Sequence, residues 1–331
     1  MQKRRFGRTG LDVSLLGFGC GAVGGLMVKG AAADQERAVA RALELGINYF
    51  DTASQYGDGE SEKNLGRVLK ALKPNVYVGT KVRLPPTERG RIGAAIAASL
   101  DASLARLQLD SVDLFQFHNA IVGTTQGANF SADSMLDEVV PEFERLRRQG
   151  KIRHFGITAV GETAALHRVV DARAFDTAQV SYNLLNPSPG GAVPTGFPAQ
   201  DYGNLLAHTK AADMGVINIR VLAGGALSAS EERHPNASPP PAPIGSGGSY
   251  QTDLERARRL MPLVREGHAD SLVEAALRYV IAHEAVSTVL IGIATLEQFE
   301  FAAQAIEKGP LPPAAMTRIA ELQQGFVGEA R

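Results

Sequence analysis

Short apolar runs alternate with helical segments along the whole chain, and this alternation most constrains the fold. The segment at residues 32–46, for example, carries apolar residues at helical spacing and ends on a glycine. Such segments are long enough to cross between parallel strands. We predict eight strands, near residues 15–20, 48–53, 76–82, 112–118, 152–158, 177–183, 215–221 and 287–292.

Eight strand–helix units favour one closed barrel over two separate halves. The chain has 331 residues and no shift in composition that would mark a domain linker. The expected fold class is therefore α/β, with residues 1–331 forming a single (β/α)8 TIM barrel domain. In this fold the carboxyl ends of all the strands open at one mouth, where functional residues gather.

Two segments rich in Gly, Pro, Ser and Asn interrupt the pattern, at residues 119–133 and 228–252. Both follow the end of a predicted strand, so we expect long loops at the carboxyl face of the barrel. The second segment has two interpretations, a flexible linker or a flap that covers a ligand.

Charge and composition exclude several classes of partner. The chain carries 34 Lys and Arg against 35 Asp and Glu, which gives no net attraction to nucleic acid or to an anionic membrane. No apolar run approaches the length of a membrane span, so we expect a cytoplasmic protein. The one cysteine, Cys20, permits no internal disulfide and is expected to be a small core residue.

A G-x-G-x-x-G motif spans Gly19 to Gly24 and raises the question of a dinucleotide-binding fingerprint. In that fingerprint the third glycine opens a helix, whereas here helical periodicity begins only near Ala33. We therefore interpret the motif as a tight strand-to-helix turn whose glycines let the backbone approach a neighbour, which could be a ligand.

Four polar residues lie at the ends of consecutive predicted strands and are expected to converge: Asp51, Tyr56, Lys81 and His118. A tyrosine titrates near pH 10, and a nearby ammonium lowers that pKa. Lys81, held by Asp51, would make Tyr56 a general acid and base, while His118 orients a carbonyl oxygen. No metal is expected, because His118 has no second ligand at a suitable spacing.

The segment INYFDTASQYGDGESEKNLGRVL, at residues 47–69, resembles the aldo-keto reductase family, as do RRFGRTGLDVSLLGFG, GTK, FQFH and STVLIG. The resemblance runs nearly end to end. It implies that the catalytic tetrad of the family falls on Asp51, Tyr56, Lys81 and His118. It also implies NADP or NAD, bound across the barrel mouth, and a small-molecule substrate that is an aldehyde, ketone, aldose or alcohol.

The resemblance further implies cofactor-binding positions, some of which depart from the family pattern. Thr158 and Gln179 match contacts to the nicotinamide carboxamide, although Ala159 replaces the usual Asn. Arg220 stands where the family often has a stacking Tyr. The phosphates are expected near the second long loop and near three residues at and after the end of the last predicted strand, Gly292, Thr295 and Gln298.

The choice between NADP and NAD stays open at this point. Members of the family that bind NADP often carry Arg or Lys at the position of Ala294, so the 2′-phosphate lacks its usual cation. Arg233 and Arg220 are the candidates to replace it. An alternative function is a nucleotide-sensing regulatory subunit with little turnover. The scarcity of aromatic residues and the small Gly21 and Ala22 favour a polar substrate such as an aldose.

Overall fold

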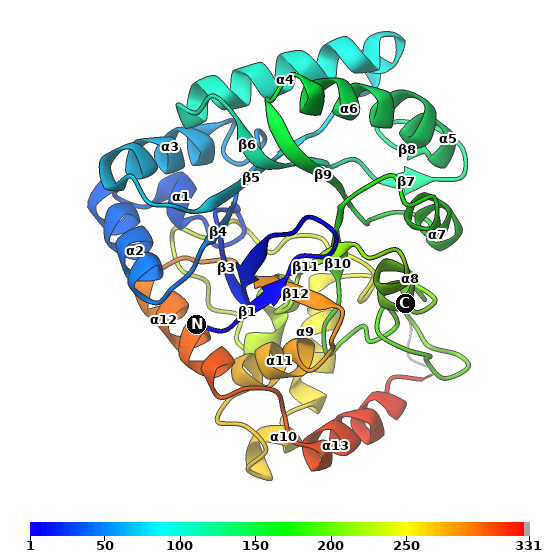
Figure 1. The fold of residues 1–331 in the computed structure, drawn as a ribbon. Helices are drawn as coiled ribbons and strands as arrows, with labels where there is room; N and C mark the ends of the chain where they lie inside the picture. Colours follow the sequence, from blue (N-terminus) through cyan, green and yellow to red (C-terminus); the bar gives the residue numbers. More distant parts are fainter. Residues whose placement is uncertain (328–331) are drawn as a thin grey trace.

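The computed structural model describes residues 1–327 and has a closed barrel of parallel strands at its centre (Figure 1). The predicted (β/α)8 barrel is confirmed. All eight predicted strands are present, with ends that differ by a few residues from the prediction. In order around the barrel they are β3 (Leu16–Gly19), β4 (Tyr49–Asp51), β5 (Tyr77–Val82), β6 (Val112–Phe117), β9 (Ile152–Thr158), β10 (Thr177–Ser181), β11 (Gly215–Ile219) and β12 (Val286–Leu290).

Helices surround the barrel (Figure 1). Each buries one face: in α2 (Ala32–Glu44) the buried residues Gln35, Ala38, Val39 and Ala42 follow helical spacing. The other long helices are α3 (Glu60–Leu72), α4 (Ile92–Leu107), α6 (Val140–Arg148), α7 (Thr163–Asp171), α8 (Leu205–Ala211), α9 (Tyr250–Arg259), α11 (Leu272–Ile281), α12 (Leu296–Glu307) and α13 (Pro313–Gln324). No helix within residues 1–327 combines the length and hydrophobicity needed to cross a bilayer.

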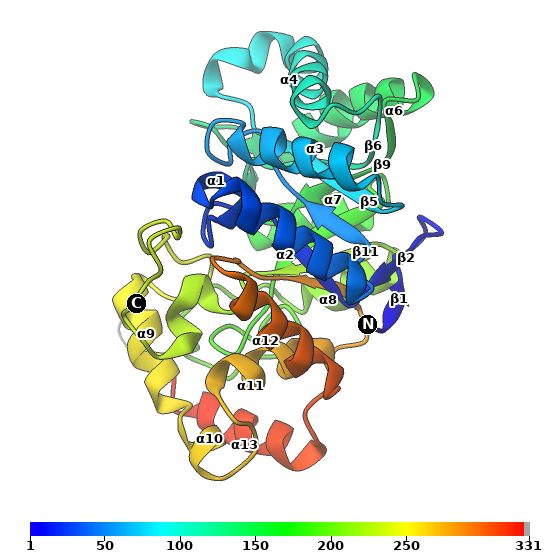
Figure 2. The same ribbon diagram turned by 90° about the vertical axis from the view of Figure 1, so that its left-hand side faces the viewer.

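An N-terminal hairpin, which the sequence analysis did not predict, lies at the end of the barrel opposite α9 (Figure 2). Its strands are β1 (Lys3–Arg5) and β2 (Asp12–Ser14). Three buried side chains from the hairpin segment, Phe6, Leu11 and Val13, form an apolar cluster with inward-facing residues Tyr49, Leu114, Ile217 and Leu290. The hairpin therefore closes the amino-terminal end of the barrel with apolar contacts.

Alternation along β5 separates the barrel interior from the helical layer. Tyr77 packs against the apolar cluster at the closed end, and Lys81 reaches the functional site at the other end. Between them, a Cβ at Gly79 would lie 2.6 Å from the Tyr49 hydroxyl, so only glycine leaves room for that ring. On the opposite face, the Thr80 hydroxyl donates to Glu62 of α3. The same strand thus anchors a helix outside and presents Lys81 inside.

The first predicted loop contains regular structure, so the prediction of an irregular segment at 119–133 was wrong for part of it. Strands β7 (Ile121–Val122) and β8 (Phe130–Ser131) pair in parallel, and a helical turn, α5 (Ala132–Ser134), follows. The Asn119 amide donates to the carbonyl oxygens of Leu84 and Ala128. The first contact ties the segment to the chain after β5, and the second closes the segment on itself.

The second predicted loop is shorter than 228–252. Ser228 ends a 3₁₀ helix (Ala223–Ser228), and residues 250–252 already belong to α9. We call the irregular part, residues 229–249, the strap. The backbone N–H of Ser238 donates to the carbonyl oxygen of Ala22 at 3.2 Å. The side-chain amide of Asn236 donates to the carbonyl oxygen of Ala294 at 3.0 Å. These bonds join the strap to segments after β3 and β12 and argue against a free linker.

The glycines of the G-x-G-x-x-G motif serve backbone packing. A Cβ at Gly19 would lie 2.4 Å from the carbonyl oxygen of Ile291, and a Cβ at Gly24 would lie 2.0 Å from the amide nitrogen of Ile293. The neighbour they approach is therefore the chain leaving β12. One expectation was wrong here: a short helix, α1 (Leu26–Lys29), follows the motif before α2 begins.

Candidate active site

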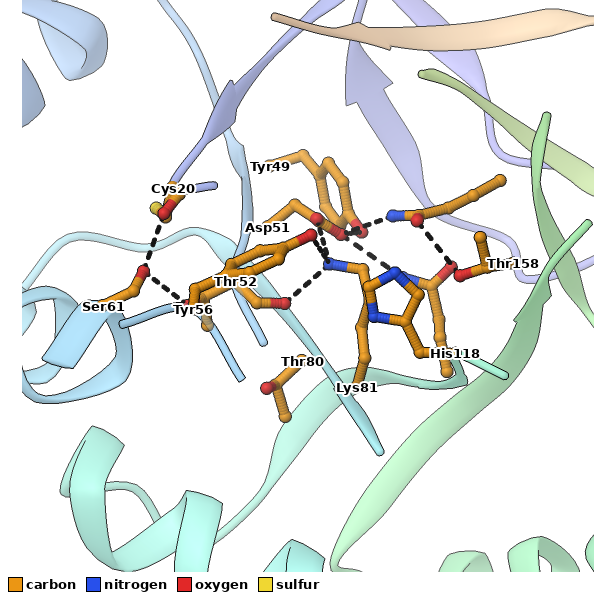
Figure 3. Close-up of polar contacts among 12 residues, drawn as sticks. Cys20, Tyr49, Asp51, Thr52, Tyr56, Ser61, Thr80, Lys81, His118 and Thr158 are labelled. Atoms are coloured by element: carbon orange, nitrogen blue, oxygen red, sulfur yellow. Dashed lines mark hydrogen bonds and ion pairs between the residues drawn. The ribbon is translucent and has the colours of Figure 1, made fainter. Parts of the chain in front are cut away.

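The four predicted residues Asp51, Tyr56, Lys81 and His118 meet at the carboxyl ends of β4, β5 and β6 (Figure 3). Lys81 is fully buried and forms an ion pair with Asp51. Its Nζ also donates to the carbonyl oxygen of Thr52 at 2.7 Å and to the Tyr56 hydroxyl at 3.3 Å. All three N–H bonds of the ammonium therefore have acceptors, one of which is the tyrosine hydroxyl.

Asp51 is the centre of a wider network inside the barrel. While Oδ1 accepts from Lys81, Oδ2 accepts from the Tyr49 hydroxyl at 2.9 Å, from Gln179 Nε2 at 3.0 Å and from Gln116 Nε2 at 3.3 Å. Four donors, counting Lys81, thus surround the two oxygens of a carboxylate that is almost fully buried. The sequence analysis missed Tyr49 and Gln116. The signal was available, because each lies two residues before a tetrad member on the same face of its strand.

Tyr56 follows β4 in the turn that leads to α3. Burial raises the pKa of its hydroxyl above the ordinary value. The positive charge of Lys81 lowers this pKa, and the negative charge of Asp51 raises it further. The expectation of a net lowered pKa was wrong, because it considered the ammonium without the loss of solvent. In this structure Tyr56 is a neutral phenol at neutral pH, and it holds a proton that it can donate.

Lys81 stays charged despite its burial. Loss of solvent lowers its pKa, but the carboxylate of Asp51 and the hydroxyl of Tyr56 outweigh that effect, and the net pKa is raised. The ammonium also lies 4.9 Å from the centre of the Tyr56 ring. A buried positive charge is thus fixed beside the phenol, where it would stabilise a phenolate.

His118 is a neutral imidazole at the end of β6. Burial, with the positive charges of Lys81 and Arg83, lowers its pKa to about 3. Its ring meets the Tyr56 ring edge-on, with the ring centres 6.2 Å apart. The Nδ1 atom is in hydrogen-bond contact with Nε2 of Gln55, a residue that the sequence analysis did not single out. His118 therefore offers hydrogen bonding beside Tyr56 without adding charge.

Thr158 and Gln179, predicted to contact the carboxamide, lie together on β9 and β10. The Thr158 hydroxyl donates to Gln179 Oε1 at 3.3 Å, and both residues are buried. Gln179 Nε2 keeps one N–H beyond its bond to Asp51, and Oε1 keeps one lone pair. A free donor and a free acceptor on one amide are the groups that bind a carboxamide, so this pair fits a nicotinamide.

Arg220 follows β11 and has a left-handed backbone, with a φ of 57°. Burial lowers its pKa, whereas Tyr56 and Asp253 act to raise it. Its Nη1 donates to the carbonyl oxygen of Ala242 in the strap at 3.4 Å. The structure thus places this cation under the strap and within electrostatic range of Tyr56.

The three positions predicted after the last strand form the turn into α12. Gly292 packs against Gly24, and the Thr295 hydroxyl accepts from the amide nitrogen of Gln298 at the start of the helix. Gln298 Oε1 in turn accepts from the amide nitrogen of Ala294 at 3.0 Å. These residues lie beside the strap, apart from the tetrad's hydrogen-bond network.

The structure describes two positions of the predicted 2′-phosphate region, Arg233 and Ala294. The Arg233 guanidinium donates to the carbonyl oxygens of Gly224 and Ser238, each at 2.9 Å, and of Val23 at 3.4 Å, so it holds the strap in place. Ala294 is only 3% exposed beneath Asn236, so a long side chain cannot be added there without moving the strap. Cys20 is buried as expected, and burial raises its pKa.

Comparison with known proteins decides the family. The Aldo/keto reductase family matches residues 15–324. The chain belongs to the aldo/keto reductase family. It is 30% identical over 310 residues to L-galactose dehydrogenase of Arabidopsis thaliana, covering 91% of this chain and 86% of that protein. It is 27% identical over 330 residues to L-glyceraldehyde 3-phosphate reductase of Escherichia coli K12, and the match covers 92% of this chain and 88% of that protein.

A solved structure supports the same assignment. The holo form of an aldo-keto reductase from Bacillus halodurans superimposes with a TM-score of 0.72 at 26% identity, covering 100% of this chain and 98% of that one. The resemblance inferred from the sequence is thereby confirmed. The dehydrogenase and reductase names of the relatives support an oxidoreductase enzyme.

The lowered pKa of His118 predicts an acid-dependent loss of stability. Histidine in an unfolded chain titrates near pH 6.5 and in the folded protein only at about 3. Between these values the unfolded state binds the extra proton, so the free energy of unfolding falls as the pH falls. This one group contributes a slope of at most about 1.4 kcal/mol per pH unit.

We expect His118→Asn to remove that contribution, measured by urea unfolding at several pH values between 3 and 7. The variant His268→Asn, outside the barrel, controls for the loss of a histidine. An unchanged pH slope in His118→Asn would contradict a buried neutral imidazole.

Proposed function

We propose that the protein interconverts a carbonyl and an alcohol with a nicotinamide cofactor, NADP or NAD, and that Tyr56 is its general acid and base. The observation that carries the proposal is the bond from the buried Lys81 ammonium to the Tyr56 hydroxyl, with Asp51 ion-paired behind it. A proton donor that meets a buried positive charge suits a reaction in which an alkoxide develops and must be protonated.

In the direction of reduction, a bound reduced nicotinamide supplies the hydride. Tyr56 donates its proton to the substrate oxygen, and Lys81 stabilises the phenolate that remains. Asp51 keeps Lys81 protonated and in place. In the reverse direction the phenolate accepts the alcohol proton. The neutral His118 positions the substrate oxygen by a hydrogen bond. The proton itself is transferred by Tyr56.

Residues around the mouth would hold the cofactor. Thr158 and Gln179 have the free donor and acceptor that a carboxamide needs. Arg220, which contacts the strap through Ala242, would contact the ring or the adjoining phosphates. Gly292, Thr295 and Gln298 surround the amino terminus of α12, which favours an anion. The strap would cover the dinucleotide and would have to open for exchange.

The substrate side favours a small polar molecule such as an aldose. A Cβ at Gly21 would make only an ordinary van der Waals contact with the Tyr56 ring, at 3.8 Å, so Gly21 leaves space beside that ring. Arg83, two residues beyond Lys81, is exposed and close enough to lower the pKa of His118. A pocket bordered by glycine and by a cation suits hydroxyl-rich substrates better than large apolar ones.

The proposal predicts that Tyr56→Phe abolishes most turnover and spares cofactor binding, because it removes a proton and little surface. We expect kcat to fall roughly 10²–10⁴-fold, with the cofactor Kd changed only a few-fold. Initial rates with NADPH and NADH on a panel of aldehydes and aldoses, with titration of cofactor fluorescence, give both quantities.

Retained turnover in Tyr56→Phe would contradict the proposal. A wild-type protein that binds cofactor tightly and turns over no member of the panel would instead favour a nucleotide-sensing regulatory subunit.

A second prediction concerns cofactor choice. Ala294 supplies no cation, and Glu297 in the first turn of α12 is ionised, since hydrogen bonds from its own backbone amide and from Thr295 lower its pKa. We expect wild-type preference for NADPH over NADH to be about tenfold or less. Gln298→Arg adds a cation at an exposed position and should improve NADPH affinity roughly tenfold or more, leaving NADH nearly unchanged.

The matched control is Gln298→Met, which loses the same bond to Ala294 without adding charge. Kd values from fluorescence titration decide the outcome. A thousandfold preference for NADPH in the wild type, unaffected by Gln298→Arg, would show that the 2′-phosphate is bound elsewhere.

A further inference from the structure

Gln55 connects two parts of the candidate site. It precedes Tyr56 in the turn between β4 and α3, and its side chain reaches His118 at the end of β6. The contact joins Nε2 of the amide to Nδ1 of the imidazole. The Gln55 side chain therefore links the turn that carries Tyr56, the proposed acid, to His118, which positions the substrate oxygen.

The chemistry of the two groups fixes where the imidazole proton lies. A neutral imidazole has one nitrogen that donates and one that accepts. In this arrangement the Gln55 amide nitrogen faces Nδ1, and because an amide nitrogen only donates, Nδ1 is the acceptor. The reversed amide would instead place Oε1 against Nδ1–H, and the tautomer measurement below distinguishes the two. The proton of His118 then lies on Nε2. Within residues 1–327, no hydrogen bond is formed by His118 Nε2, so this N–H is available to a ligand.

We infer that Gln55 is a positioning residue that holds His118 in the tautomer protonated on Nε2, so that this N–H donates to the substrate oxygen. The inference rests on the proposed function, since it names how His118 takes part in the reaction. Gln55 itself acts through His118.

The other end of the amide makes no hydrogen bond. Gln55 Oε1 is buried and has no hydrogen-bond partner in the described structure. A half-satisfied buried amide contributes little to stability. Within residues 1–327 the contact with His118 is the one hydrogen bond that the Gln55 side chain makes.

The first test is spectroscopic. Two-bond proton–nitrogen correlation spectra of protein labelled with ¹⁵N-histidine report which imidazole nitrogen carries the proton. We expect the wild type to show His118 protonated on Nε2, and Gln55→Met to show a mixture of tautomers. His118→Asn assigns the signal. A wild-type His118 protonated on Nδ1, or a tautomer unchanged in Gln55→Met, would overturn the inference.

The second test uses a reversed hydrogen bond. In Gln55→Glu the introduced carboxylate accepts from Nδ1–H, which leaves Nε2 bare whenever the imidazole is neutral. The carboxylate also favours the imidazolium, which carries protons on both nitrogens and donates from Nε2. The other titratable or charged groups near His118 are Lys81, Arg83 and Tyr56. All three residues are retained in the Gln55→Glu variant.

We therefore expect kcat/KM of Gln55→Glu to be highest at low pH and to fall tenfold or more as the pH rises through the new imidazole pKa. Gln55→Met should lose at least tenfold at every pH, with the cofactor Kd unchanged in both variants. Rates equal to wild type in Gln55→Met, or a wild-type pH profile in Gln55→Glu, would overturn the inference. Wild-type turnover tests the proposed function separately, and the tautomer is measured whether or not a substrate is found.

Discussion

The buried ion pair between Lys81 and Asp51 is the interaction on which the interior of the barrel depends. Removing two charges from water costs several kcal/mol for each ion, and the cost is offset only when further hydrogen bonds satisfy both groups. Here the ammonium finds the carbonyl of Thr52 and the hydroxyl of Tyr56, and the carboxylate finds three side-chain donors from three strands. The polar layer at the mouth therefore supplies the hydrogen bonds that this buried pair needs.

The division of the barrel into an apolar end and a polar end follows from strand geometry. Along β5 the inward residues run from Tyr77, which packs against the apolar cluster, through Gly79, to Lys81 at the mouth. Gly79 admits the Tyr49 ring, whose hydroxyl then reaches Asp51 at 2.9 Å. The same alternation that closes one end of the barrel therefore supplies a hydrogen bond to the site at the other.

Periodicity and strand ends were sufficient to predict the barrel and the convergence of the four polar residues, because both depend on local sequence and on parallel topology. The hairpin β1–β2 escaped prediction because its strands are three residues long and are stabilised by packing against the barrel. The pKa of Tyr56 was predicted in the wrong direction because burial is a property of the whole fold. The role of Arg233 depends on three carbonyls from separate segments, which no local pattern reveals.

The central claim is that the Lys81 charge, and not the shape of the pocket alone, makes Tyr56 an effective acid. Turnover at saturating cofactor in Lys81→Met, compared with the double variant Lys81→Met and Asp51→Asn, tests it most directly, since the double variant leaves no unpaired buried charge. The account predicts that both lose turnover by roughly 10²-fold or more, while cofactor binding stays within a few-fold and the double variant remains folded. A folded double variant with turnover within tenfold of wild type would contradict it.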